Sequence, residues 1–259
     1  ELQHLFKSFN PGTPDAKLAL NDLSFAVHDG DFVTIIGANG AGKSTLFNAI
    51  AGSFITDAGR IFLDGKDITL QAEHKRARTI GRLFQDPMQG SAPGMTIEEN
   101  LALASGRGGW MHRTSQADRR FFREKVALLG MGLEDRMNQP VGLLSGGQRQ
   151  ALTLLMATAT RPQLLLLDEC TAALDPGTAE KVLALVNRIV GEEHLTCLMI
   201  THDMQAALDL GNRTIMMNNG QIVMDVENEE RCGLTISDLL LKFKEAAGKE
   251  LSNDRMLLT

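Results

Sequence analysis

The sequence predicts an α/β fold: a core with a mainly parallel sheet, an antiparallel β subdomain at the N-terminus and an inserted α-helical subdomain. Three observations lead to this prediction. After residue 145, apolar strand patterns alternate with helical patterns, an order typical of parallel strands joined by crossover helices. The first 30 residues indicate two strands around a turn. Strand patterns then disappear between residues 86 and 140, where helical spacing takes over.

The composition is that of an ordinary soluble chain. Its 259 residues, 43% of them hydrophobic, suffice for one large domain or two small ones. The net charge of −6 argues against a protein that binds nucleic acid over its whole surface. Three cysteines with neither a disulfide nor a zinc pattern favour a reducing compartment. We find no apolar run long enough to span a bilayer and no signal-peptide pattern, so we expect a soluble, cytoplasmic chain.

The N-terminal part of the chain has short strand patterns with turn-forming residues between them. Alternating or β-branched apolar residues indicate the strands, and clusters of Asn, Pro, Gly and Asp mark the turns. The predicted elements are strands over 2–9 and 18–30, a buried strand over 31–37, a helix over 46–52, and a hairpin strand over 60–68 that turns at Asp64-Gly65.

Helical spacing dominates the middle of the chain, and strands alternate with helices after it. The predicted elements are helices over 97–105 and 118–132 with an exposed loop over 106–115, a helix over 145–160, a strand over 163–169, a helix over 178–193, a strand over 195–202, a helix over 203–211, a hairpin over 214–226 that turns at Asn219-Gly220, and an amphipathic helix over 236–250. We therefore expect a single domain over 1–259, with its core at 1–85 and 141–225, a helical subdomain at 86–140 and a helical tail at 226–259.

A glycine-rich segment with the spacing G-x-x-x-x-G-K-S lies between the predicted strand 31–37 and helix 46–52. Glycines let backbone N–H groups wrap around a phosphate, and a helix N-terminus adds a favourable dipole. Lys43 would reach the β- and γ-phosphates, and the Ser44 hydroxyl would bind Mg²⁺. The flanking strand and helix favour a P-loop NTPase core over a simple glycine turn. The predicted nucleotide-binding residues of this loop are Gly37, Asn39, Gly40, Ala41, Gly42, Lys43, Ser44 and Thr45.

Two carboxylates, Asp168 and Glu169, end the predicted buried strand 163–169, where open α/β sheets form their sites. Asp168 suits a Mg²⁺ shell, and Glu169 can act as the general base on an attacking water. His202 ends the predicted strand 195–202 and should emerge at the same sheet edge. The alternatives without function are a charged turn after the strand, for Asp168 and Glu169, and a solvated or helix-capping residue, for His202. The phosphate loop favours catalytic roles for Glu169 and His202.

A second anion site is predicted at the start of the helix 145–160. Ser145 can cap this helix, and Gly146 and Gly147 can expose backbone donors. One nucleotide does not need two phosphate-binding elements about 100 residues apart. A head-to-tail dimer explains both, because residues 144–148 of one protomer can cover the γ-phosphate held by the other. ATP then favours the closed dimer, and hydrolysis reopens it.

Together these motifs resemble the ATP-binding cassette (ABC) nucleotide-binding domains, over residues 1 to about 225. The phosphate loop is similar to the family's Walker A motif, LSGGQ at 144–148 to its signature, and LLLLDE at 164–169 to its Walker B motif. The resemblance implies that Gln85, in RLFQDP, is a Mg²⁺ ligand and a link to a permease. It also implies that Ala173-Leu174-Asp175 is the D-loop and that His202 is the switch histidine. The implied nucleotide-binding residues outside the loop are Phe9, Gln85, Ser145, Gly146, Gly147, Gln148 and Asp175, and the implied metal ligands are Ser44, Gln85 and Asp168.

Some positions depart from the family pattern or stay open. Phe9 falls where the family has an adenine-stacking aromatic, usually Tyr, and Phe6 or Phe25 is the alternative. The segment QRQALTLLMA is apolar where an Arg is usual. Cys170 stands where Pro, Ala or His is common, and it either makes hydrolysis thiol-sensitive or is an inert small residue. Because no motif residue is missing, we expect an active ATPase.

The resemblance implies the ATPase subunit of a membrane transporter, in pattern a bacterial importer, that uses ATP and Mg²⁺. Its implied partners are a second copy of the chain, a separate permease docked on the helical subdomain, and an extracytoplasmic substrate-binding protein, with no nucleic acid. The chain would lie at the cytoplasmic face of the membrane. Two segments of the chain are similar to the corresponding segments of cassettes that serve branched-chain-amino-acid-type permeases: LDECTAALDP and NNGQIVMDV. This similarity hints at a small organic cargo.

The sequence fits three other nucleotide-binding functions less well. A soluble non-transport ABC ATPase, in DNA repair or translation, usually has tandem cassettes or long coiled coils, and this chain has one cassette and no heptad run. A GTPase switch needs an N/T-K-x-D motif, which the sequence lacks. A purely structural nucleotide-binding subunit usually has a degenerate catalytic Glu or His, and both are intact here.

Overall fold

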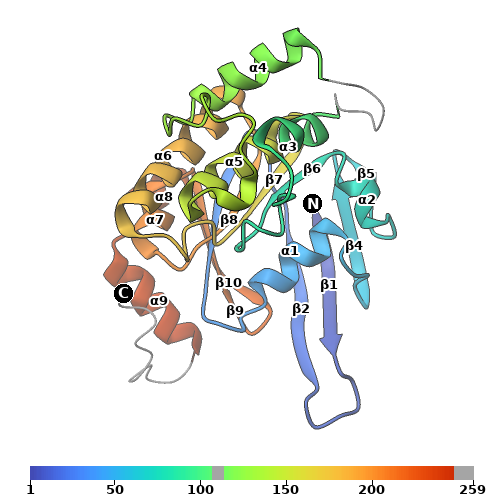
Figure 1. Cartoon of the computed structure of the whole chain (residues 1–259). Helices are drawn as coiled ribbons and strands as arrows, with labels where there is room; N and C mark the ends of the chain where they lie inside the picture. The colour runs from blue at the N-terminus through green and yellow to red at the C-terminus, as the bar shows by residue number, and fades with distance from the viewer. Residues whose placement is uncertain (107–113, 248–259) are drawn as a thin grey trace. The chain divides into compact units, whose positions relative to one another are not determined.

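A computed structural model of the chain describes residues 1–106 and 114–247 (Figure 1). Most of the loop predicted over 106–115, and the end of the helix predicted over 236–250, lie outside the described residues. The chain divides into two compact units, each described here by itself. Unit 1 comprises Glu1–Ala77 and Thr196–Thr259, and unit 2 comprises Arg78–Leu195. The subdomain boundaries drawn from the sequence remain predictions.

The antiparallel β subdomain lies in unit 1. Its sheet has the order β2-β1-β4-β5 and consists of β1 (Leu2–Phe9), β2 (Lys17–Phe25), β4 (Ala58–Leu63) and β5 (Lys66–Asp67). Strands β1 and β2 form a hairpin in which Phe9 lies opposite Lys17. The turn between β4 and β5 contains Asp64 and Gly65, both with positive φ, because this tight turn needs left-handed backbone. The predicted strands are confirmed, although β2 ends at Phe25 and not at residue 30.

Unit 1 also contains a parallel group of strands that ends in a hairpin. Strand β3 (Phe32–Ile36) pairs in parallel with β8 (Cys197–Ile200) on one side and with β9 (Arg213–Asn218) on the other. Strand β10 (Gln221–Glu227) then pairs antiparallel with β9. All five residues of β3 are buried, as the apolar run predicted, since both faces of a parallel sheet are covered.

The helices described in unit 1 are α1 (Lys43–Ala51), α2 (Glu73–Arg76), α7 (Met204–Asp209), α8 (Asn228–Cys232) and α9 (Ile236–Ala247). Helix α9 buries Leu239 and Phe243 in a cluster with Met204 and Met216, which confirms its amphipathic pattern. Helices α2 and α8 are too short to give a periodic signal and were not predicted. The buried Arg76 of α2 donates hydrogen bonds to the carbonyls at the end of α1, where the helix dipole favours a cation.

Unit 2 combines two parallel strands with helices. Strand β6 (Ile80–Leu83) pairs with the fully buried β7 (Leu164–Asp168), and the helices are α3 (Ile97–Ala104), α4 (Gln116–Ala127), α5 (Gly146–Thr158) and α6 (Pro176–Glu193), with a 3₁₀ turn, η1 (Val141–Leu143), before α5. Strand β6 was not predicted, because Gly81 and Arg82 interrupt its apolar pattern. Glycine is required there, since a Cβ at Gly81 would lie 2.4 Å from the Ala157 carbonyl oxygen.

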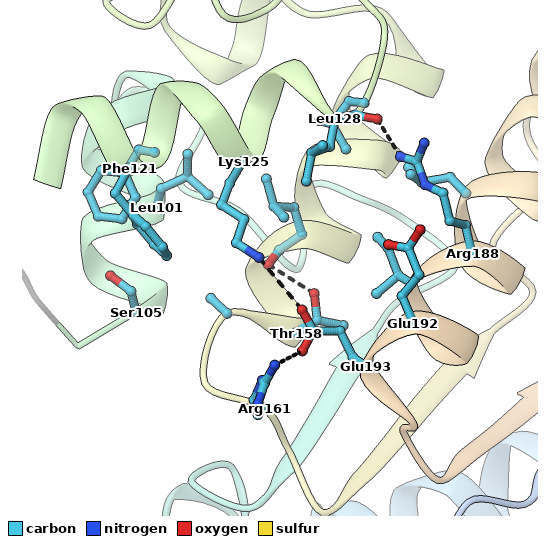
Figure 2. Close-up of a pocket in the computed structure, with 16 residues that line it drawn as sticks. Leu101, Ser105, Phe121, Lys125, Leu128, Thr158, Arg161, Arg188, Glu192 and Glu193 are labelled. Atoms are coloured by element: carbon cyan, nitrogen blue, oxygen red, sulfur yellow. Dashed lines mark hydrogen bonds and ion pairs between the residues drawn. The ribbon is translucent and has the colours of Figure 1, made fainter.

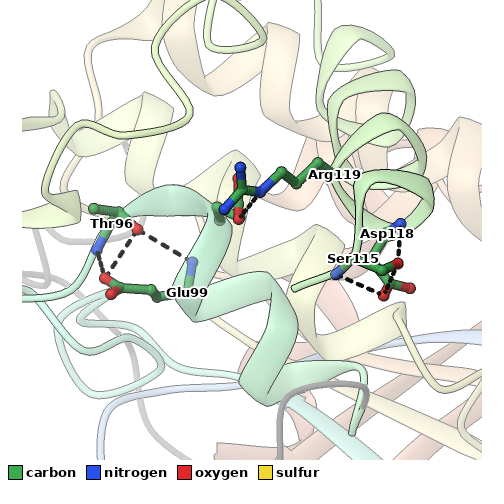
Figure 3. A network of polar contacts seen from close by, with 6 residues as sticks. Thr96, Glu99, Ser115, Asp118 and Arg119 are labelled. Carbon is green, nitrogen blue, oxygen red and sulfur yellow. Dashed lines mark hydrogen bonds and ion pairs between the residues drawn. The ribbon is translucent and has the colours of Figure 1, made fainter. Parts of the chain in front are cut away.

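Capping boxes fix the starts of α3 and α4 (Figure 3). The Glu99 carboxylate accepts hydrogen bonds from the backbone and hydroxyl of Thr96, and these bonds lower the pKa of Glu99. Ser115 and Asp118 form the same arrangement on α4. Helix α4 ends five residues before the predicted limit of 132, because the chain turns through left-handed glycines at 130 and 132.

No helix within residues 1–106 and 114–247 has both the length and the apolar character needed to cross a bilayer.

Candidate functional site

The phosphate loop connects the end of β3 to the start of α1. A Cβ at Gly37 would lie 2.2 Å from the Met217 carbonyl oxygen, and one at Gly42 would lie 2.3 Å from the Ala19 carbonyl oxygen. Gly42 has a φ of 102° and is the N-cap of α1. Within the described residues no side chain caps this helix and no acidic residue lies in its first turn. Its N-terminal N–H groups therefore suit an anionic ligand.

Lys43 is the first residue of α1, and its side chain folds back into the loop. The ammonium donates hydrogen bonds to the carbonyl oxygens of Gly37 (2.6 Å) and Ala38 (3.1 Å), and Lys43 is buried. A lysine in this place can exchange a loop carbonyl for a phosphate oxygen with little movement of the backbone. The next residue, Ser44, is exposed at the start of the helix.

The switch histidine predicted from the sequence lies at the same sheet edge as the phosphate loop. Strands β3 and β8 are parallel neighbours with Ile35 opposite Ile200, so Gly37 and His202 both follow strand ends at this edge. His202 is exposed, and the next residue, Asp203, caps α7 by accepting hydrogen bonds from two backbone N–H groups. The catalytic role expected for His202 remains a prediction.

Of the three candidate stacking aromatics, Phe9 has the most accessible ring. Phe9 is 38% exposed and makes an edge-to-face contact with Phe54 at 5.7 Å between ring centroids. Phe25 is only 8% exposed and is a core residue of the β subdomain, so it cannot stack on a base. Phe6 is half-buried. Exposure favours Phe9 over both alternatives.

In unit 2, the acidic pair and Gln85 also share one sheet edge. Leu83 lies opposite Leu167 in the parallel pair β6–β7, so Gln85 and Asp168 both lie at the carboxyl ends of these strands. The Asp168 carboxylate is buried and lies 3.6 Å from the Arg82 guanidinium, which also stacks on Phe84. Sequence reasoning missed Arg82, because a single arginine in a short strand has no periodic signal.

Glu169 directly follows β7 in a left-handed conformation, with a φ of 45°. This backbone conformation is costly for a residue with a Cβ, on the order of 1 kcal/mol, and such strain is often found at functional sites. The side chain is half-buried rather than part of the core. The carboxylate thus belongs to a half-buried residue at the end of a fully buried strand.

The predicted signature segment starts α5, as expected. Ser145 is the N-cap, its hydroxyl accepting a hydrogen bond from the Gln148 N–H (3.3 Å), while the Gln148 amide oxygen accepts one from the Ser145 N–H (3.2 Å). Gly146 is exposed, but Gly147 is buried. A depression of about 600 Å³ adjoins the segment, with Ser145, Gln148 and Thr178 in its lining.

Gly147 packs so tightly on α6 that only glycine fits. A Cβ there would lie 2.1 Å from the Thr178 methyl carbon, so we expect Gly147→Ala to lower the free energy of unfolding by about 1–3 kcal/mol and to reduce ATPase activity. A double variant that also carries Thr178→Ser lacks this methyl group, so it should regain most of the free energy of unfolding and most of the ATPase activity. Denaturant unfolding and phosphate release measure the effects. Gly146→Ala is the control for the free energy of unfolding alone, since its Cβ meets Leu174 at an ordinary 3.4 Å. Equal losses of unfolding free energy in the two alanine variants would contradict the packing argument.

Thr178 also links the signature helix to the predicted D-loop. The Asp175 carboxylate caps α6 by accepting a hydrogen bond from the Thr178 N–H (3.0 Å), and the hydrogen bonds from Thr178 lower the pKa of Asp175. Asp175 is exposed at the start of α6. The packing of Gly147 on Thr178 therefore places the signature and the D-loop side by side within unit 2.

Cys170 is expected to be inert toward maleimides in the folded protein. It is 4% exposed, and burial raises the pKa of its thiol to about 12. Since the reactive thiolate exists mainly above the pKa, very little is present at pH 7.5. Mass spectrometry of the Cys170 peptide should find it unmodified after treatment of native protein and modified after treatment in denaturant. Rapid labelling of native Cys170 with loss of ATPase activity would instead establish thiol-sensitive hydrolysis.

A separate cavity of about 310 Å³ opens among α3, α4, α5 and α6 of unit 2 (Figure 2). Leucine and phenylalanine side chains line part of it, and lysine, arginine and glutamate side chains line another part. At its rim the Glu193 carboxylate lies between Arg161 (2.5 Å) and Lys125 (3.6 Å), as Figure 2 shows. The residues that line this cavity in the described part of the chain include none of the predicted site residues. It shares Leu128, Leu129, Leu185 and Arg188 with the depression beside the signature segment.

A glycine loop between a buried parallel strand and an uncapped helix N-terminus defines the P-loop class of nucleotide-binding proteins, and unit 1 has this arrangement. Within that class, residues 20–172 match the family model described as ABC transporter. The chain belongs to the ABC transporter family. It is an ATPase, the ATP-binding subunit of a transporter, and not the soluble non-transport ATPase considered as an alternative.

Individual relatives agree with this assignment. The chain is 41% identical over 253 residues to a tyrosine transport ATP-binding protein of Clostridioides difficile, covering 95% of this chain and 99% of the relative. It is 35% identical to an energy-coupling factor transporter ATP-binding protein of Enterococcus faecalis, covering 83% and 74%. Among solved structures, an ABC transporter cassette in its ADP conformation has a TM-score of 0.77 at 28% identity, covering 96% and 98%. A dimeric cassette in a post-hydrolysis state with ADP and Pi has a TM-score of 0.75 at 27% identity, covering 87% and 97%.

Proposed function

We propose that this chain powers a bacterial importer by closing, as a homodimer, around two molecules of ATP with Mg²⁺. The observation that carries the proposal is the presence of two glycine-containing helix starts in one chain, after Gly42 and after Ser145, and helix starts of this kind suit a phosphate ligand. In a head-to-tail dimer, the signature of one protomer covers the phosphates held by the loop of its partner. The dimeric cassette with ADP and Pi among the similar structures supports this arrangement.

ATP stabilises the closed dimer because each phosphate group gains its second set of donors only when the protomers meet. In this proposal Lys43 and the N–H groups of α1 hold the phosphates, and Phe9 stacks on the adenine. Glu169 accepts a proton from the attacking water, and His202 contacts the γ-phosphate. Release of phosphate removes the contacts across the dimer, so the protomers separate and the next cycle can begin.

The residues present suit Mg²⁺, which prefers oxygen ligands. Ser44 offers an exposed hydroxyl, Gln85 an exposed amide oxygen, and Asp168 a buried carboxylate beside Arg82. We propose these three as the metal ligands. Bound together with ATP, the ion would neutralise charge on the phosphate oxygens.

We propose a small amino-acid-like cargo, taken up with the help of an extracytoplasmic binding protein. The tyrosine transport relative supports this class of cargo, since the two chains match over almost their full lengths. Several relatives have names that state import, such as the methionine import ATP-binding protein of Rhizobium johnstonii. We place the permease on the helical segment 86–140 and the chain at the cytoplasmic face of the membrane, with no nucleic acid as a partner.

The experiment that tests the transporter assembly is purification of the tagged chain, at its native level, from detergent-extracted membranes. Mass spectrometry should then find a polytopic membrane protein in stoichiometric amount, and extraction from cells with the untagged chain is the control. The permease so identified leads to its binding protein, whose thermal shift with single amino acids tests the cargo. A chain that is recovered without a membrane partner, or with ribosomes or DNA, would contradict the proposal.

A further inference from the structure

Lys17 occupies an unusual place beside the phosphate loop. It is the first residue of β2, it is exposed, and in the β1–β2 hairpin it lies directly opposite Phe9. Its side chain reaches toward the loop, since a Cβ added to Gly40 would lie 2.9 Å from the Lys17 ammonium nitrogen. The hairpin thus carries an exposed aromatic ring and a cation that reaches the phosphate loop.

This placement follows from the direction of β2. Side chains two residues apart on a strand lie on the same face, and the strand passes along the loop. The Ala19 carbonyl oxygen approaches Gly42 so closely that a Cβ there would lie at 2.3 Å, just as the Lys17 ammonium approaches Gly40. A hydrogen bond from the Asn21 N–H to the Gly220 carbonyl (3.0 Å) further anchors β2. The backbone that carries Lys17 is therefore held firmly against the site.

The Lys17 ammonium has no hydrogen bond or ion pair among residues 1–106 and 114–247. Lys7, on the neighbouring strand, differs in this respect, because it is paired with the Asp57 carboxylate at 2.9 Å and donates to the Ile55 carbonyl. A lysine without a partner, held beside a loop that binds phosphate, adds positive potential where the ligand is most negative. The lysine ammonium is a compact positive charge with three N–H donors, and both properties suit binding to phosphate oxygens.

We propose that Lys17 is a nucleotide-binding residue that contacts the phosphates of ATP, so that the β1–β2 hairpin binds both ends of the ligand. Phe9 stacks on the base, and Lys17 donates to a phosphate oxygen at Gly40. This inference rests on the proposed ATP site and adds a second lysine to it. Its chemistry predicts selectivity for the number of phosphates, because an ammonium gains from phosphate charge and not from the base.

The test is the affinity of the full-length chain for ADP and for AMP, measured by isothermal titration calorimetry. We expect Lys17→Gln to weaken ADP binding about 5- to 20-fold and AMP binding less than 2-fold, because one charge-assisted contact at a partly exposed site is lost. Lys17→Arg should restore most of the ADP affinity. The loss should also shrink at high salt, since salt screens the lost contact.

Lys66→Gln is the matched control, since Lys66 is also an exposed lysine on a hairpin of unit 1. An ADP affinity of Lys17→Gln within 2-fold of the unsubstituted chain would overturn the inference. Equal losses for ADP and AMP would overturn it too, because they would indicate a disturbed hairpin rather than a lost phosphate contact. Failure of the proposed function is distinguishable, because the unsubstituted chain itself would then not bind ADP.

Discussion

Replacing Glu169 by glutamine is expected to lower the kcat of ATP hydrolysis by about 10²–10⁴, while ATP-dependent dimers persist. Glutamine keeps the size of the side chain but loses the carboxylate that can accept a proton from water. Glu169 has a φ of 45°, and glutamine carries the same backbone strain because it has the same Cβ. The substitution therefore changes the proton acceptor and leaves the local geometry at the end of β7 as it is.

Two measurements on the Glu169→Gln variant separate an effect on ATP hydrolysis from an effect on ATP-dependent dimerisation. Phosphate release gives kcat, and size-exclusion chromatography with and without ATP gives the dimer. Glu180→Gln, at an exposed position of α6, is the control for loss of one negative charge. Near-normal turnover of Glu169→Gln would assign the general base to another group. Loss of the ATP-dependent dimer would mean that Glu169 acts in nucleotide binding rather than in hydrolysis.

Features that depend on local sequence could be predicted well. Strand β7 is a run of four leucines before two carboxylates, and the loop from Gly37 to Ser44 has a fixed spacing, so both can be found without tertiary information. The cap at Ser145 also follows from local chemistry, since a serine three residues before Gln148 can form a capping box. For these elements the structure confirms the prediction.

Features that depend on contacts between distant segments could not be predicted. Arg82 lies beside Asp168 only because β6 and β7 are neighbours, and Lys17 lies beside Gly40 only because β2 passes along the loop. Gly147 was expected to expose a backbone donor, but the approach of Thr178 from α6 is what requires a glycine there. Such pairs are separated by many residues in the sequence, and neither partner alone has a recognisable pattern.

Lys43→Met is expected to lower the affinity for ATP by about 10²–10³ and to abolish measurable hydrolysis. Methionine keeps most of the apolar stem and removes the ammonium, so the buried position stays filled. In the structure this ammonium donates to the Gly37 and Ala38 carbonyls, and a phosphate oxygen would take the place of one of these acceptors. Both carbonyls lose a donor in the variant, so the loop should also become less stable. Calorimetric titration with ATP measures the affinity, and a thermal midpoint within a few degrees of the unsubstituted chain shows that the fold survives.

An ATP affinity that is unchanged in a folded Lys43→Met protein would exclude Lys43 as a phosphate ligand. The nucleotide site would then have to lie on another surface of the chain, because the uncapped start of α1 and the lysine behind it are the features that place it here.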